Sequence, residues 1–184
     1  LEDLKDIVMH EVGHTLGLRH NFRASTAYTQ AQLNDPEFTK ANGISGSVME
    51  YNAINIALKG ERQGTYSMGT LGPYDYWAIE YAYKPIAPAD EKQELARIAA
   101  RSSEPLLAFA NDPDAGGSPA NDGIDPLVNR FDLGDDPLAY YRKRLQLSQE
   151  LWRRVQDRTP FAGDDPLRQR RSLRQYGLDP DEAS

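Results

Sequence analysis

The stretch HEVGHTLGLRH, residues 10–20, contains all three histidines of this 184-residue chain. His10 and His14 are four residues apart, and residues at that spacing lie one above the other on the same face of an α-helix. The two side chains can therefore hold one metal ion between them. Gly17 can adopt positive φ at little cost, so it can end the helix and turn the chain back. His20 then approaches the same ion from a loop.

The residue types in this stretch favour a catalytic zinc site. Three imidazoles leave the fourth position of a tetrahedral zinc open for water. Glu11 lies too far round the helix to bind the ion, but it is well placed to deprotonate a water molecule there. We therefore predict one catalytic Zn²⁺ held by His10, His14 and His20, with Glu11 as the general base. A zinc ion that only holds the fold is a weaker alternative, because a closed site has no use for Glu11.

The flanking residues predict how this helix is held. Asp3 or Glu2 begins the helix and Gly17 ends it. A stripe of apolar residues lies roughly opposite the two histidines: Leu4, Val8, Met9, Val12 and Leu16. We expect this stripe to enter a hydrophobic core while the other face carries the metal.

The pattern HExxHxxGxxH resembles the signature of the metzincin clan of zinc endopeptidases. A second motif of that clan is a tight turn with a methionine beneath the metal, and SVMEY at residues 47–51 is similar to it. The resemblance implies that Met49 forms a hydrophobic floor under the histidines. It also implies that Tyr51 reaches the metal or the oxyanion. The alternative is that the ring of Tyr51 only packs beneath the metal.

A third stretch, GPYDYWAIEYAY at residues 72–83, is similar to the final helix of matrixin and serralysin catalytic domains. Pro73 suits a first helical turn. The apolar surface that can pack under the site is expected from Tyr74, Trp77, Ile79, Tyr81 and Ala82. Residues 7–85 together resemble large bacterial zinc-dependent metalloproteases related to matrixins and adamalysins. This implies a secreted or periplasmic parent protein. Asn21 matches none of the better-known branches, so their substrate preferences do not carry over.

The resemblance implies a mainly α fold, or α+β if a parent protein is included. Metzincins place a twisted β-sheet before the catalytic helix, and this chain reaches its first metal ligand at residue 10. We expect the remainder of a longer protein to supply that sheet. An extended peptide substrate needs a strand edge to pair with, so the fragment alone is expected to cut poorly or not at all.

Two regions are predicted along the chain. Residues 1–85 form a metzincin-like zinc-binding core with the catalytic helix, the Met-turn and the following helix. Residues 86–184 form a helical C-terminal extension packed on that core. Shorter elements are expected as helical pieces at 27–33 and 36–41, and as a wall beside the metal at 52–66.

The C-terminal region has three recognisable parts. Residues 90–101 are predicted to form a helix, and a longer helix begins near Asp136 with a stripe suited to packing: Leu138, Tyr141, Leu145, Ser148, Trp152 and Val155. The segment 111–126 carries Asp112, Asp114, Asn121, Asp122 and Asp125. Their oxygens could bind calcium, but the spacing differs from that of an EF-hand and a solvated loop is the simpler interpretation. The cluster Arg168, Arg170, Arg171 and Arg174 is interpreted as a solvated helix face.

Composition narrows the class of function. The net charge of -7 argues against general nucleic-acid binding, and no apolar run is long enough to span a membrane. The chain has no cysteine, which excludes disulfides and a Cys-ligated metal. The sequence therefore predicts a zinc-dependent endopeptidase, or its catalytic-core fragment, acting on a peptide or protein substrate. The alternative is a peptide-binding or scaffolding domain that retains zinc without turnover.

Overall fold

The computed structural model describes residues 2–115, 123 and 125–156. Over these residues the secondary structure is helical and contains no strand, which confirms the prediction of a mainly α fold. The cluster Arg168, Arg170, Arg171 and Arg174 lies outside the described residues. None of the helices in the described part of the chain combines the length and the apolar composition that a membrane crossing requires.

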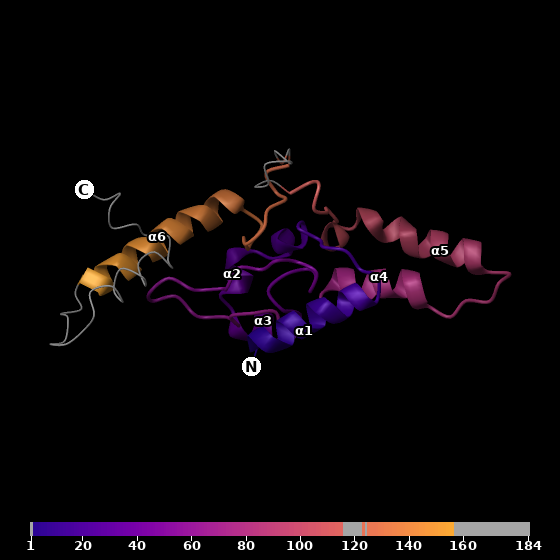
Figure 1. The fold of residues 1–184 in the computed structure, drawn as a ribbon, viewed down its shortest axis with the longest axis horizontal. Coiled ribbons are helices and arrows are strands. Elements are labelled where there is room, and N and C mark those ends of the chain that lie inside the picture. The colour runs from indigo at the N-terminus through magenta and orange to yellow at the C-terminus, as the bar shows by residue number, and fades with distance from the viewer. Residues whose placement is uncertain (1, 116–122, 124, 157–184) are drawn as a thin grey trace. The chain divides into compact units, whose positions relative to one another are not determined.

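The elements follow one another as short helices joined by long irregular segments (Figure 1). They are α1 (Glu2–Thr15), η1 (Ala24–Ala27), α2 (Gln30–Leu33), α3 (Pro36–Asn42), α4 (Pro73–Tyr83), α5 (Glu91–Ala99), η2 (Ala100–Ser103), η3 (Pro105–Leu107) and α6 (Pro137–Gln156). The helices predicted at 73–83, at 90–101 and from 137 onward are confirmed. Helix α4 contacts both α5 and η3. The chain divides into compact units 1–140 and 141–184, so residues 86–140 fold together with the histidines.

Helix α1 ends as the sequence predicts. Gly17 has a φ of 86°, and its N–H donates to the carbonyl of His14 at 3.0 Å. The N–H of Leu18 donates to the carbonyl of Gly13 at 3.0 Å. This pair of bonds closes a Schellman turn, in which a left-handed residue satisfies the last carbonyl groups of the helix. The turn reverses the chain and starts the loop that carries His20.

The apolar stripe of α1 does not enter the core. Leu4, Val8, Val12 and Leu16 are between 41% and 62% exposed, and only Met9 packs against the core. The inward face instead carries Asp6, His10 and Gly13 at helical spacing, and the exposed Asp3 continues the same row and contacts Ser67. The prediction about the buried face was therefore wrong. Periodicity shows that a helix has two unlike faces, but it does not show which of them meets the rest of the protein.

Polar contacts explain why this other face turns inward. Asp6 accepts a hydrogen bond from the Met68 amide at 3.1 Å, and Asp3 accepts one from the Ser67 hydroxyl. A buried amide without an acceptor destabilises a fold by about 1–3 kcal/mol, so these carboxylates hold α1 against the segment around Met68. Burial raises the pKa of Asp6.

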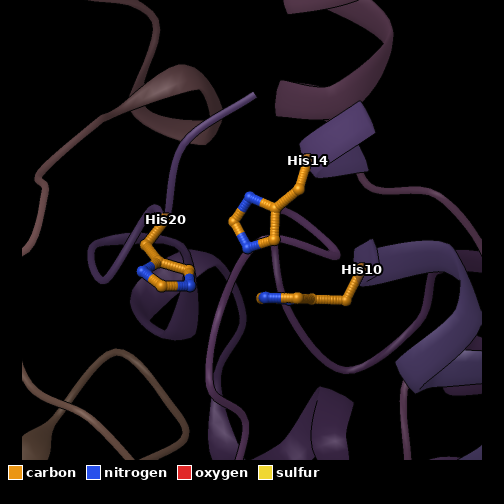
Figure 2. A group of neighbouring side chains, drawn as sticks. All are labelled: His10, His14 and His20. Carbon is orange, nitrogen blue, oxygen red and sulfur yellow. The ribbon is translucent and has the colours of Figure 1, made fainter. Parts of the chain in front are cut away.

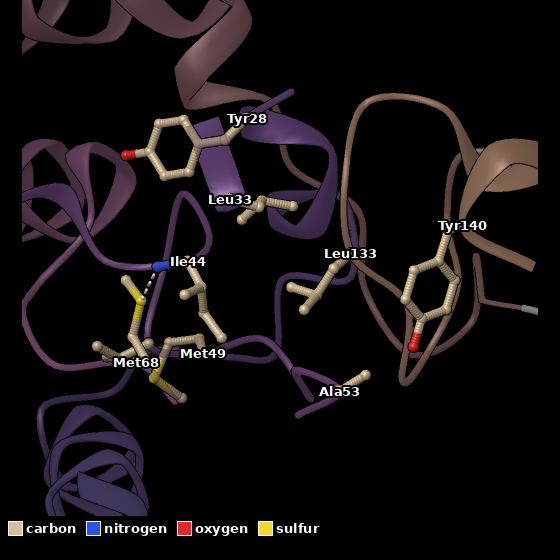
Figure 3. Packing of buried hydrophobic residues seen from close by; sticks show 9 residues of the cluster. Tyr28, Leu33, Ile44, Met49, Ala53, Met68, Leu133 and Tyr140 are labelled. Carbon is tan, nitrogen blue, oxygen red and sulfur yellow. Dashed lines mark hydrogen bonds between the residues drawn. The ribbon is translucent and has the colours of Figure 1, made fainter. Parts of the chain in front are cut away.

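Figure 3 shows the packing of the main hydrophobic core. It consists of Tyr28, Leu33, Ile44, Val48, Met49, Ala53, Met68, Leu133 and Tyr140, with Met9, Leu18, Ala27 and Phe38 packed around it. A smaller cluster contains Phe22, Ala110, Ala115 and Val128, and Tyr51 packs against it. Both clusters join segments that are far apart in sequence.

The beginning of α6 also differs from its predicted packing. Leu138, Tyr141 and Leu145, which start the predicted stripe, are exposed. Tyr140 is buried instead, and its hydroxyl donates to the carbonyl of Phe131 at 3.0 Å. The segment before the helix provides that carbonyl, and the ring of Tyr140 belongs to the main hydrophobic core, so the buried side of the helix start is the side of Tyr140 and not the predicted stripe.

Gly13 lies where helix α1 packs against the side chain of Met49. A Cβ atom on Gly13 would overlap the sulfur of Met49, which is fully buried. The methionine cannot move away without disturbing the core around it. The close approach of helix and turn therefore favours glycine at this position.

We expect Gly13→Ala to destabilise the metal-free protein by about 1–3 kcal/mol, because of this overlap. Helix propensity alone predicts the opposite, a gain of roughly 1 kcal/mol. Thermal unfolding measures the difference. Gly69→Ala is the control, because a Cβ there meets nothing within 4 Å. A melting temperature for Gly13→Ala at or above that of the control contradicts the packing argument.

Glu50 is a buried carboxyl group next to Met49. Its two oxygens accept hydrogen bonds from the amides of Ser25 and Tyr51, at 3.0 and 2.9 Å. Burial raises the pKa of Glu50 well above its ordinary value of 4.5, and the charge of Asp132 acts in the same direction, while the two amide bonds oppose the shift. Burial raises the pKa of Asp132 as well.

A raised pKa in the folded state means that the folded protein binds the proton more tightly than the unfolded chain. The stabilisation of the folded state by the proton on Glu50 is therefore complete below pH 4.5. It is lost as the pH rises through the folded-state pKa of Glu50. We expect the free energy of unfolding to fall over this range, and to fall less steeply in Glu50→Gln, which cannot ionise. Denaturant unfolding at several pH values tests this. Identical slopes for the two proteins count against it.

Candidate metal centre

The structure brings the three histidines together. One ring nitrogen of each of His10, His14 and His20 lies within 4.8 Å of the other two, an arrangement that could hold a metal ion. Figure 2 shows the rings of the two α1 histidines and of His20, from the following loop, facing a common point. His10 is buried, and the other two rings are partly buried.

The other nitrogen of each ring has an acceptor. His10 Nδ1 lies 2.7 Å from the Val48 carbonyl, and His14 Nδ1 lies 3.0 Å from the Leu18 carbonyl. His20 Nδ1 lies 3.1 Å from each carboxylate oxygen of Asp112. Since carbonyl and carboxylate oxygens only accept, these contacts place the hydrogen on Nδ1 and leave the lone pair on Nε2.

The donor set fits a zinc ion. His20 Nε2 is buried and has no hydrogen-bond partner, which is costly for a polar atom unless a ligand occupies the site. Burial lowers the pKa of His10, with the neighbouring histidines acting in the same direction. The neutral ring is the form that binds metal. Three neutral imidazoles with an open position match a catalytic zinc site.

Asp75 holds the turn that carries Met49. Its Oδ1 accepts from the Ser47 hydroxyl at 2.6 Å, and its Oδ2 accepts from the amides of Val48 and Gly72 at 2.9 and 2.8 Å. Burial raises the pKa of Asp75, and these three hydrogen bonds oppose the shift. The Val48 carbonyl, fixed in this way, is the acceptor for His10. Asp75 therefore positions a metal-site histidine through the backbone of the turn.

The sequence drew attention to α4 through its aromatic residues, but Asp75 is the buried residue of that helix. Tyr81 and Ala82 are exposed, so the prediction that they pack under the site was wrong. Trp77 instead donates to the Ile98 carbonyl at 2.8 Å and ties α4 to α5. A motif comparison could have found Asp75, because an early aspartate is part of the helix that residues 72–83 resemble.

Tyr51 lies beside the histidines. Its ring centroid is 4.5 Å from that of His20 and 5.4 Å from that of His10. Phe131 stacks on the same ring at 5.8 Å with an angle of 17° between the planes. Tyr51 therefore packs against two of the three histidines, while the role of its hydroxyl is a separate question.

Glu11 follows His10 on α1 and is exposed to solvent. Its charge acts on the ring of His10, where it opposes the lowering of the pKa. The carboxylate is therefore near the histidines and open to water, as a general base must be.

The acidic segment 111–126 is only partly described, and Asn121 and Asp122 lie outside the described residues. Asp112 contacts His20, a site contact that sequence reasoning missed. Asp125 forms an ion pair with Arg23 at 2.7 Å. Calcium binding here stays a prediction. The wall predicted at 52–66 is an irregular segment in which the Asn55 amide donates to the Tyr66 carbonyl at 2.9 Å, and its role also stays a prediction.

Comparison with known proteins agrees with this site. The profile of a protein family described as Met-zincin matches residues 1–176. No curated protein and no solved structure matches the chain. The matched residues include the histidines, the turn around Met49 and helix α4. The chain therefore belongs to the Met-zincin family.

Proposed function

We propose that this chain is the catalytic core of a zinc endopeptidase that hydrolyses peptide bonds. The convergence of His10, His14 and His20 carries the proposal, because each Nδ1 has its own acceptor and one nitrogen of each ring remains for a metal. When bound, zinc supplies Lewis acidity, which polarises the scissile carbonyl and makes water easier to deprotonate.

Glu11 is the general base of this mechanism. Its carboxylate takes a proton from water as the oxygen attacks the scissile carbonyl carbon and the new C–O bond forms. Glu11 then passes the proton to the leaving nitrogen as the C–N bond breaks. One carboxylate thus serves both steps and returns to its starting state.

Tyr51 is the candidate for stabilising the oxyanion. Its ring lies against His10 and His20, so its phenol group belongs to the immediate surroundings of the site. A hydrogen bond to the developing negative charge acts mainly in the transition state, which is where it accelerates the reaction.

We also propose that this chain works as part of a longer protein. The apolar stripe on α1 is exposed, with Leu4 at 62% and Val8 at 51%. Exposed apolar stripes of this kind are typical of surfaces that other polypeptide covers. We infer that another part of a parent protein packs there and contributes the strand edge for the substrate. A bacterial origin and a secreted or periplasmic location rest on the resemblance alone.

We expect Glu11→Ala to lower the rate of peptide hydrolysis by about a thousandfold or more while zinc stays bound, because water loses its base and no ligand is removed. A fluorogenic peptide library and metal analysis measure the two effects. His14→Ala is the matched comparison, since it removes a ligand on the same helix and should lose both zinc and activity.

Turnover retained in Glu11→Ala contradicts the proposed mechanism. Absence of zinc from the wild-type chain after purification with zinc contradicts the proposed site. Zinc binding without hydrolysis, both in this chain and in any longer protein that contains it, favours a peptide-binding or scaffolding domain instead.

Tyr51→Phe should lower the catalytic rate by roughly tenfold to a hundredfold, because it removes a donor to the oxyanion and leaves the ring packing intact. Zinc affinity and melting temperature should change little. Tyr51→Leu is the second variant, and a role limited to packing predicts that it loses stability. An unaltered rate in Tyr51→Phe assigns the residue to packing alone.

A further inference from the structure

The three histidines differ in the group that holds Nδ1. His10 and His14 use backbone carbonyls, those of Val48 and Leu18. His20 uses the side chain of Asp112, which lies 92 residues away in sequence. Both carboxylate oxygens are 3.1 Å from Nδ1. A charged acceptor makes a stronger hydrogen bond than a neutral one, so His20 is held differently from the other two.

The segment before Asp112 is fixed to the loop that carries His20. The Phe22 amide donates to the Ala110 carbonyl at 2.8 Å. The Asn21 side chain donates to the Ala108 carbonyl at 3.0 Å and accepts from the Ala110 amide at 3.2 Å. The two residues that follow the third histidine therefore form hydrogen bonds to the irregular stretch 108–110 and bring Asp112 to the ring.

Asp112 is itself held in place by its neighbours. Its amide donates to the side chain of Asn111 at 2.7 Å, and the Asn111 amide donates to the side chain of Asp114 at 2.9 Å. Arg130 lies 3.5 Å from Asp112 Oδ1 and 4.8 Å above the ring of Phe22. The carboxylate thus faces His20 on one side and a guanidinium on another, which favours its charged form.

We propose that Asp112 is a positioning residue of the metal centre. It accepts the Nδ1 hydrogen of His20, fixes the tautomer that offers Nε2 to zinc, and makes that ring the most electron-rich of the three ligands. The inference rests on the proposed zinc site. It gives a segment about ninety residues downstream a direct part in metal binding.

A role in folding alone does not account for this contact. The side chain of Asp112 is 42% exposed. Exposed ion pairs contribute little to stability, about 0–1 kcal/mol. A carboxylate that orients a metal ligand, in contrast, typically changes metal affinity by 10- to 100-fold. The two roles therefore predict different measurements.

The test measures zinc affinity by competition with a chelator, together with the melting temperature of the metal-free protein. We expect Asp112→Asn, which keeps an acceptor oxygen and loses the charge, to weaken zinc binding by about tenfold, and Asp112→Ala by up to about a hundredfold. The melting temperature of both metal-free variants should stay within a few degrees of wild type.

Asp125→Asn is the matched control. Asp125 lies on the same segment, is 49% exposed and is paired with Arg23, but it contacts no histidine. This variant should keep wild-type zinc affinity. Zinc affinity within twofold of wild type in Asp112→Ala overturns the inference. An equal loss of zinc affinity in Asp125→Asn overturns it as well. So does a loss of zinc affinity in Asp112→Asn that is accompanied by a comparable drop in the melting temperature of the metal-free protein. Failure of the wild-type chain to bind zinc is a separate result, and it overturns the proposed function itself.

Discussion

The backbone of Val48 is fixed on both sides, and the metal centre depends on it. Its amide donates to Asp75 at 2.9 Å, and its carbonyl accepts from His10 at 2.7 Å. The turn that contains Val48 therefore cannot shift without moving a ligand or breaking a hydrogen bond to the buried carboxyl group of Asp75, and the latter is costly in the interior. The next residue, Met49, meets Gly13 of the same helix. Val48 and Met49, which are neighbours in one turn, thus fix how closely α1 approaches this turn and which face of α1 points toward it.

The inward face of α1 follows from this arrangement. His10 and Gly13 must face the turn, and Asp3 and Asp6 lie on the same face at helical spacing. Their contacts with Ser67 and Met68 then complete the docking of the helix. The apolar side chains of Leu4 and Val8 are left on the outer face as a consequence. A helix that carries metal ligands toward its own core has its hydrophobic face free for other polypeptide.

The parts that sequence predicts well are those set by local geometry. The spacing of His10 and His14 needs only the helical period, and the end of α1 needs only the freedom of Gly17 to adopt positive φ. The buried face of α1 could not be predicted, because tertiary contacts decide between two faces. Asp112 could not be predicted either, since its contact with His20 depends on how residues 108–110 pair with Asn21 and Phe22.

The three acceptors also determine how charge is distributed at the site. Histidines bind metal as neutral rings, so a divalent ion at this site would bring two uncompensated positive charges among them. A carboxylate bound directly to the ion compensates charge but occupies a coordination position. In the proposed metal centre Asp112 would place its negative charge behind His20 instead, and a coordination position would be left for water. In the proposed mechanism Glu11 would then be free to move protons, because Asp112 would compensate part of the charge of the metal from the far side of the third histidine.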